Sequence, residues 1–217
     1  MDAKARFVRN GTTQIPKSVP LWLIIGYWVC TLIAVAVVLR RLLALAHPSR
    51  SGPAELANLD LVFASHARVT LAHIIPSLFF VLLAPFVLVR PLARFSWPER
   101  LLFPLGVIVG ITAYGMSVYS VGGWTERSAV LFFNSMFLFS LARAWRFRQR
   151  QQTREKLEWL TRAIGILLGI ATTRPVMGVF FATSRLTHLE PRQFFGIAFW
   201  IGFSINWIVA EIWIGNT

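Results

Sequence analysis

The sequence has little charge, few acidic residues and a single cysteine, and each scarcity argues against a class of protein. Only 14% of its 217 residues are charged, whereas soluble globular proteins carry about 25%. The one cysteine, Cys30, rules out an internal disulfide and any four-cysteine zinc or iron–sulfur site. These scarcities argue against an ordinary soluble enzyme.

Apolar residues are abundant in the sequence, and basic residues outnumber acidic ones. Hydrophobic residues account for 56% of the chain, and 22 Lys and Arg stand against 9 Asp and Glu. The basic residues lie between long apolar runs instead of on one polar face. That distribution indicates membrane topology and argues against a nucleic-acid partner.

Six apolar runs are long enough to cross a bilayer, which takes roughly 20 mostly apolar residues. They cover approximately residues 21–39, 69–89, 101–121, 128–145, 159–183 and 194–214. The second run would begin earlier, near Leu59, if Asn58 or Asp60 caps it. The sequence therefore predicts an all-α integral membrane protein, with a basic tail over residues 1–20 and a single bundle of six transmembrane helices within 21–217.

The distribution of basic residues predicts the orientation of this bundle. One side of a six-helix serpentine carries fourteen Lys and Arg and the other carries seven. Because positive residues favour the cytoplasmic side, we expect both termini in the cytoplasm and the bundle in a bacterial inner membrane. The basic stretch between residues 143 and 156 serves as an anchor there, or as a binding strip for anionic lipid headgroups or an acidic partner.

Ionised side chains inside a bilayer are costly, so they mark structural pairs or functional sites. Glu211 reaches about the depth of Arg162 if the last two helices are antiparallel neighbours. We predict a structural ion pair between them, which would leave neither charge unpaired in the membrane. Gly165 and Gly169 lie near Arg162 on the same helix, and this small-residue face is expected to meet the last helix.

Arg174 lies roughly 18 Å further along its helix than Arg162, at 1.5 Å per residue, with no acidic residue expected at its depth. It would contact neutral groups, reach outward along its helix, or bind an anionic group of a ligand. A haem propionate, a lipid phosphate and a quinone oxygen are the ligand groups considered. His73, Tyr114 and Asn206 are the candidate cofactor-binding residues around it.

The histidines limit which cofactor is expected. His66 and His73 share one helix face about 10 Å apart, so they cannot ligate one iron from both sides. The other two histidines fall in predicted loops, which leaves His73 as a single ligand for a haem or pigment, or as a hydrogen-bonded interior residue. No nucleophile, carboxylate pair or metal-spaced cluster is visible, so no catalytic residue and no metal site is predicted.

Several segments in order resemble the predicted membrane protein family known as domain of unknown function 2306 (DUF2306). They are Leu71-Ala72-His73-Ile74, Tyr119-Ser120-Val121-Gly122-Gly123, Glu158-Trp159-Leu160-Thr161-Arg162, Ala171-Thr172-Thr173-Arg174, and Asn206-Trp207-Ile208-Val209-Ala210-Glu211. The resemblance runs from about His73 to Ile214 and implies an uncharacterised multi-helix bundle. Family members typically carry further histidines where this chain reads Ser96-Trp97-Pro98 and Lys156-Leu157-Glu158, so the resemblance favours a structural role.

Two functions follow. One is a non-catalytic subunit or scaffold of a larger membrane complex, recognised by other membrane subunits within the bilayer. The other is a membrane redox protein that holds one haem or quinone near His73 and Arg174. An enzyme is less expected than either, and a transporter is disfavoured because no inverted repeat is visible.

Overall fold

The computed structural model describes residues 20–46, 61, 63–88, 97–188 and 190–216, and every regular element among them is a helix. Residues 1–19 of the basic tail lie outside the described residues, and so does the predicted early start of the second helix at Leu59. Six of the described helices are long and apolar enough to cross a membrane. The fold is the predicted all-α bundle of six membrane-spanning helices.

The described helices follow one another in chain order. They are α1 (Leu21–Ala46), α3 (Ala67–Leu83), α4 (Pro85–Leu88), α5 (Trp97–Ser117), α6 (Gly123–Gln149), α7 (Thr153–Thr187) and α8 (Pro191–Gly215). α3 and the single turn α4 lie in line, and together they make one candidate span over Ala67–Leu88. Pro85 follows the junction, where its missing N–H interrupts the helix ladder.

Several helices extend beyond the apolar runs from which they were predicted. α6 begins at Gly123 instead of residue 128, and α7 begins at Thr153 instead of residue 159. The added turns are polar, so hydropathy alone excludes them, but their backbone hydrogen bonds continue the helix. This difference matters because the added first turn of α6 contains Glu126.

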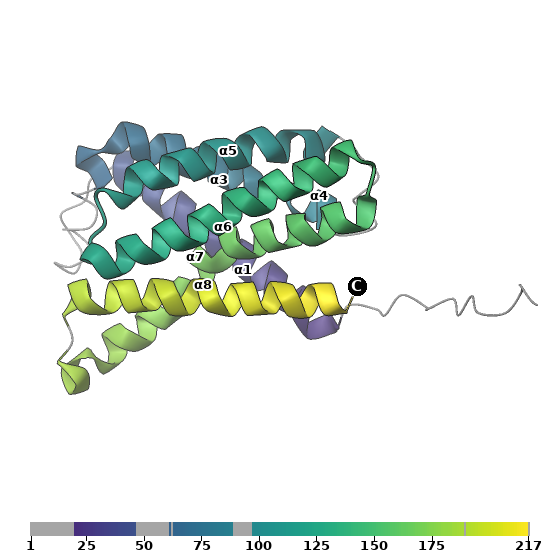
Figure 1. The fold of residues 1–217 in the computed structure, drawn as a ribbon. Coiled ribbons are helices and arrows are strands. Elements are labelled where there is room, and N and C mark those ends of the chain that lie inside the picture. The colour runs from purple at the N-terminus through teal and green to yellow at the C-terminus, as the bar shows by residue number, and fades with distance from the viewer. Residues whose placement is uncertain (1–19, 47–60, 62, 89–96, 189, 217) are drawn as a thin grey trace, which may run out of the picture.

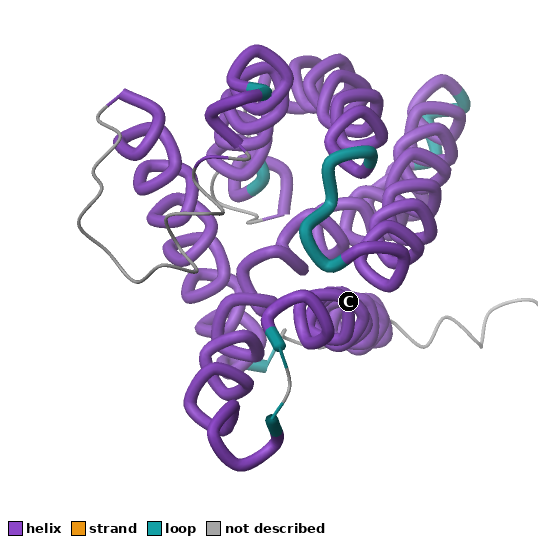
Figure 2. The backbone as a smooth tube through the Cα atoms, turned by 90° about the vertical axis from the view of Figure 1, so that its left-hand side faces the viewer, coloured by secondary structure: helices purple, strands orange, loops and turns teal. Residues whose placement is uncertain are grey.

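The helices pack side by side into one bundle (Figure 1). The most extensive contacts are α7 with α8, α6 with α7, and α3 with α5. Figure 2 looks nearly along the helix axes and shows the last turns of α7 and the start of α8 projecting from the rest as a hairpin. α1 begins and α8 ends at the same end of the bundle (Figure 1), as an even number of spans requires.

Small residues set the distance between α7 and α8. A Cβ atom on Gly165 would lie 2.7 Å from the Cβ of Ala210, and one on Gly169 would lie 2.6 Å from the ring of Phe203. The predicted glycine face of α7 thus packs on α8. A third close approach, at Gly202 of α8, was not predicted. A Cβ atom on Gly202 would lie 2.7 Å from the backbone nitrogen of Thr173.

Apolar side chains fill the bundle and also cover its outside. Phe80, Leu102 and Leu160 are fully buried in the core. Leu32, Ile111 and Val179 are among the large apolar side chains that are exposed. A surface of this kind is stable in contact with lipid chains, as expected for an integral membrane protein.

Candidate functional site

A cavity of about 230 Å³ opens between α1, α3, α5, α6 and α7, with α8 at its back. Most of its walls are apolar, and Ile74, Phe137 and Ile166 are examples. Its polar and ionisable lining residues include Arg41, Thr70, His73, Ser77, Ser117, Tyr119, Ser120, Glu126, Asn134 and Arg174. We call this space the charged cavity because side chains of both signs line it.

Arg174 enters the cavity from α7, one residue before Pro175. Its Nε is buried without a hydrogen-bond partner among the described residues, and its Nη1 lies 3.9 Å from the sulfur of Met177. A thioether is a weak acceptor. The guanidinium is therefore poorly satisfied by the protein itself, although it normally forms several strong hydrogen bonds.

Glu126 reaches the same cavity from the first turn of α6, and its position depends on the glycine turn before it. The backbone N–H of Gly122 donates to Glu126 Oε2 at 2.5 Å. A Cβ on Gly122 would lie 2.9 Å from the backbone nitrogen of Gly196, and one on Gly196 would lie 2.6 Å from that of Glu126. Glycine at both positions lets the α5–α6 turn lie directly on α8, which fixes the carboxylate.

The expectation that Arg174 has no acidic residue at its depth is wrong. Glu126 and Arg174 both line the charged cavity and interact electrostatically. Glu126 was not predicted as a site residue because it precedes the fourth apolar run, which begins near residue 128. An acidic residue just after a Gly-Gly pair is a helix-start signal, and reading it that way would have placed the carboxylate inside the span.

Arg41 was also missed as a site residue, because it follows the apolar run that defined the first helix. α1 continues to Ala46, so Arg41 lies on the helix and lines the cavity. Its guanidinium carbon lies 3.9 Å from the ring centre of Phe63, a cation–π contact. Two arginines and one glutamate thus line a single space.

His73 lines the cavity from α3, and its hydrogen bonds define its tautomer. Its Nδ1 lies 3.2 Å from the carbonyl oxygen of Val109 and 3.1 Å from the hydroxyl of Thr112. A carbonyl only accepts, so Nδ1 is the protonated nitrogen and Nε2 of the neutral ring is an acceptor. His73 is therefore a hydrogen-bonded interior histidine on the lining of the cavity.

The other two predicted cofactor-binding residues lie elsewhere. The hydroxyl of Tyr114 forms a 2.7 Å hydrogen bond with Ser135 between α5 and α6. The side-chain amide of Asn206 donates to the Thr172 hydroxyl. Asn206 lines a separate cavity of about 170 Å³ between α1, α7 and α8. The structure thus brings His73 and Arg174 together on one cavity and separates Tyr114 and Asn206 from them.

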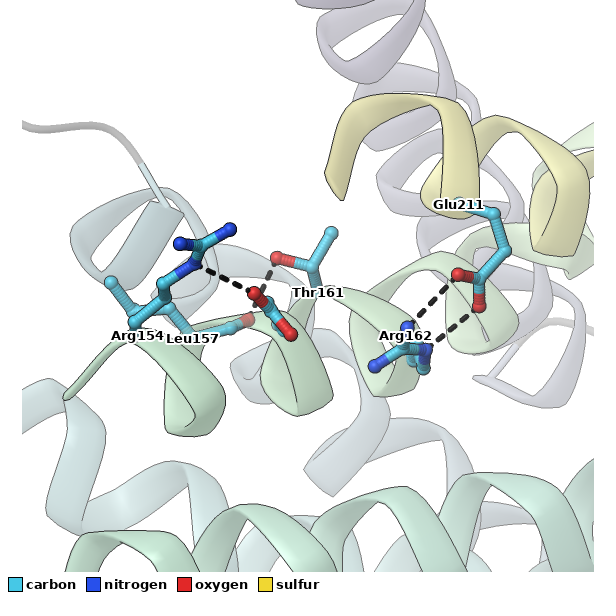
Figure 3. A network of polar contacts seen from close by, with 6 residues as sticks. Arg154, Leu157, Thr161, Arg162 and Glu211 are labelled. Atoms are coloured by element: carbon cyan, nitrogen blue, oxygen red, sulfur yellow. Dashed lines mark hydrogen bonds and ion pairs between the residues drawn. The ribbon is translucent and has the colours of Figure 1, made fainter. Parts of the chain in front are cut away.

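The Arg162 and Glu211 side chains meet between α7 and α8 (Figure 3). Arg162 Nε donates to Oε1 at 2.7 Å and Nη2 donates to Oε2 at 2.9 Å. The guanidinium also lies over the ring of Trp159, 4.6 Å from its centre. This pair connects the two helices through a two-pronged contact, at a distance from the charged cavity, which neither residue lines.

Comparison with known proteins matches residues 70–214 to the predicted membrane protein family DUF2306. The protein belongs to the DUF2306 family. No curated protein and no solved structure matches the chain. The DUF2306 region contains His73, Glu126 and Arg174, whereas α1, with Arg41, precedes it.

The charged cavity of this DUF2306 protein fits some of the expected cofactors better than others. Sites for drug-sized ligands occupy about 300–1,000 Å³, and a volume of about 230 Å³ lies below that range. The rigid macrocycle of a haem or a chlorophyll-type pigment would not be enclosed by it, and His73 is the one histidine among the lining residues. A polar head with the first part of a chain fits its size and its lining.

Proposed function

We propose that this membrane protein binds a lipid-like amphiphile, with the polar head at Arg174 and the chain along the apolar walls of the charged cavity. The observation that carries the proposal is the guanidinium of Arg174, which lines the cavity with no hydrogen-bond partner at Nε. A desolvated cation without acceptors is costly. A phosphate or carboxylate would supply short, charge-assisted hydrogen bonds to it.

The apolar part of the cavity supports the same ligand class. Ile74, Val109 and Phe133 line it and would exclude water from an alkyl chain. A quinone, the other small ligand expected from the sequence, brings neutral oxygens. It would bring no charged group to Glu126 and Arg174, so an ionised head group fits this lining better.

A role as a subunit or scaffold of a larger complex would use the outer apolar surface of the bundle. The same surface would face lipid in a protein that works alone, so an apolar surface does not distinguish a subunit of a complex from a single protein. We therefore base the proposal on the cavity. We place the protein in a bacterial inner membrane, with both termini in the cytoplasm, on the strength of its basic-residue distribution.

The proposal is tested by lipid that remains on the purified protein. Wild type, Arg174→Gln and Arg154→Gln would be purified in mild detergent and analysed by native mass spectrometry and by lipid extraction. Arg154 is a matched control because it is 83% exposed and pairs with Glu158 outside the cavity. We expect bound phospholipid on wild type and on Arg154→Gln, and a loss of about tenfold or more in Arg174→Gln.

Equal lipid occupancy in all three proteins would overturn the proposal. A visible absorption spectrum of the same wild-type sample provides a second readout. A Soret band that shifts on reduction with dithionite would indicate that the protein binds a haem instead of a lipid. Such a spectrum would require the cavity to widen beyond its described volume.

A further inference from the structure

We infer that the head group bound in the charged cavity is zwitterionic, with a phosphate at Arg174 and Arg41 and a primary ammonium at Glu126. The inference rests on the proposed function and narrows it to the phosphoethanolamine class of lipid. It depends on one juxtaposition, in which two cations and one carboxylate from three different helices line the same space.

The two signs of charge exclude simpler head groups. A purely anionic head would satisfy Arg174 but would also meet the carboxylate of Glu126, and like charges repel strongly where water is excluded. A neutral head would leave charges of both signs desolvated. A zwitterion supplies a phosphate for Arg174 and an ammonium for Glu126.

The geometry of Glu126 suits an ammonium ligand. The carboxylate is fixed because Gly122 donates its N–H to Oε2 at 2.5 Å, and the turn that carries Gly122 lies directly on Gly196 of α8. A carboxylate has about four acceptor positions, so the backbone hydrogen bonds from Gly122 and Val121 leave others for a ligand.

A primary ammonium fits this site better than a quaternary one. Aromatic faces bind quaternary ammonium groups, and Tyr119 and Phe133 are among the aromatic residues that line the cavity. A primary ammonium differs because it also donates up to three hydrogen bonds to oxygen acceptors. Glu126 provides such acceptors, and the hydroxyl of Ser120 lies on the same lining. The expected preference is therefore phosphatidylethanolamine over phosphatidylcholine.

The test measures lipid binding to delipidated, full-length protein by native mass spectrometry. The probes are dioleoyl phosphatidylethanolamine, its N-acetylated derivative, dioleoyl phosphatidylcholine and dioleoyl phosphatidylglycerol. We expect wild type to bind the ethanolamine lipid about tenfold more tightly than each of the other three, as one charge-assisted hydrogen bond would give. The comparison with the N-acetylated lipid needs no variant, because it removes only the ammonium.

Two variants then locate the effect. Glu126→Gln keeps an oxygen that can accept a hydrogen bond from Gly122, so the turn should be preserved. This variant is expected to lose the preference for the ethanolamine lipid while it still binds phosphatidylglycerol. Glu155→Gln is the control, because Glu155 lies in the first turn of α7 and does not line the cavity. It should bind all four lipids as wild type does.

The outcomes separate the inference from the function on which it rests. Wild type that binds all four lipids equally, or a preference that survives in Glu126→Gln, overturns the zwitterion assignment while lipid binding stands. If the ethanolamine and choline lipids bind equally, and both bind more tightly than phosphatidylglycerol, the preference for a primary ammonium is overturned. Absence of binding by any of the four lipids overturns the proposed function itself.

Discussion

Arg162 of α7 and Glu211 of α8 are joined by two parallel hydrogen bonds of 2.7 and 2.9 Å. The Glu211 side chain is 39% exposed and that of Arg162 is 17% exposed. A pair that is only partly buried contributes less than a fully buried one, because the surroundings still solvate the carboxylate. The contact therefore fixes how α7 lies on α8 more than it stabilises the bundle as a whole.

Removing either partner should destabilise the bundle moderately. We expect Glu211→Gln and Arg162→Gln each to cost about 1.5–3 kcal/mol, the range for hydrogen bonds to charged groups. The double variant should cost less than the sum of the two, because the second change no longer breaks an existing pair. Unfolding in detergent measures all three, and additive effects would mean that the two residues do not interact.

The close packing of α8 on α7 at Gly202 should leave no space for a side chain. Gly202→Ala is expected to lower the melting temperature in detergent, because the new Cβ would lie 2.7 Å from the backbone nitrogen of Thr173 and α7 and α8 would have to separate. Gly178→Ala is the matched control, since a Cβ there has no neighbour within 4 Å. Its melting temperature should be unchanged or slightly higher, as for alanine in an open helix position. Equal effects of the two substitutions would contradict close packing at Gly202.

Glu99 should matter more than Glu158, although both are acidic residues in ion pairs. Glu99 of α5 accepts from Lys156 Nζ at 2.8 Å and lies 3.3 Å from Arg148 Nε, so it connects α5 to both α6 and α7. Among the residues that the structure describes, Glu158 pairs within α7, with the exposed Arg154. We expect Glu99→Gln to cost about 1–3 kcal/mol and Glu158→Gln about 0.5 kcal/mol or less. Chemical or thermal unfolding in detergent ranks the two variants, and the reverse order would refute the bridging role.

The orientation of the bundle can be measured with engineered cysteines. After Cys30→Ser, Arg150→Cys places a thiol between α6 and α7 and Gly123→Cys places one at the opposite end of α6. A membrane-impermeant maleimide added to intact cells should label only the Gly123→Cys protein, if the basic side of the bundle is cytoplasmic. Labelling of Arg150→Cys from outside would reverse the orientation.

Local sequence carries the number and approximate position of the helices. Runs such as residues 21–39 are too apolar for water and long enough for a bilayer, so they specify spans without reference to any other segment. The depth argument for Arg162 and Glu211 also needed only helix geometry and neighbouring helices. The glycine face of α7 was predictable because Gly165 and Gly169 recur at helical spacing.

The charged cavity could not be predicted in the same way, because its residues come from six different helices. Hydropathy assigned Glu126 and Arg41 to the flanks of their spans, since an ionised residue ends an apolar run, whereas helix hydrogen bonding continues through both. Tyr114 and Asn206 were placed near Arg174 by depth alone. Depth does not determine the direction in which a side chain points, and both face other neighbours.

The sequence by itself determined that this protein is a six-helix membrane bundle of the DUF2306 type, because bilayer thickness and backbone hydrogen bonding leave an apolar chain few alternatives. Only the tertiary structure decided which charges share a cavity. Rotation of each helix about its axis is set by close contacts such as that between Gly202 and Thr173. Those contacts turn Arg174, His73 and Glu126 toward one space, because side chains on neighbouring helices must interlock to pack closely.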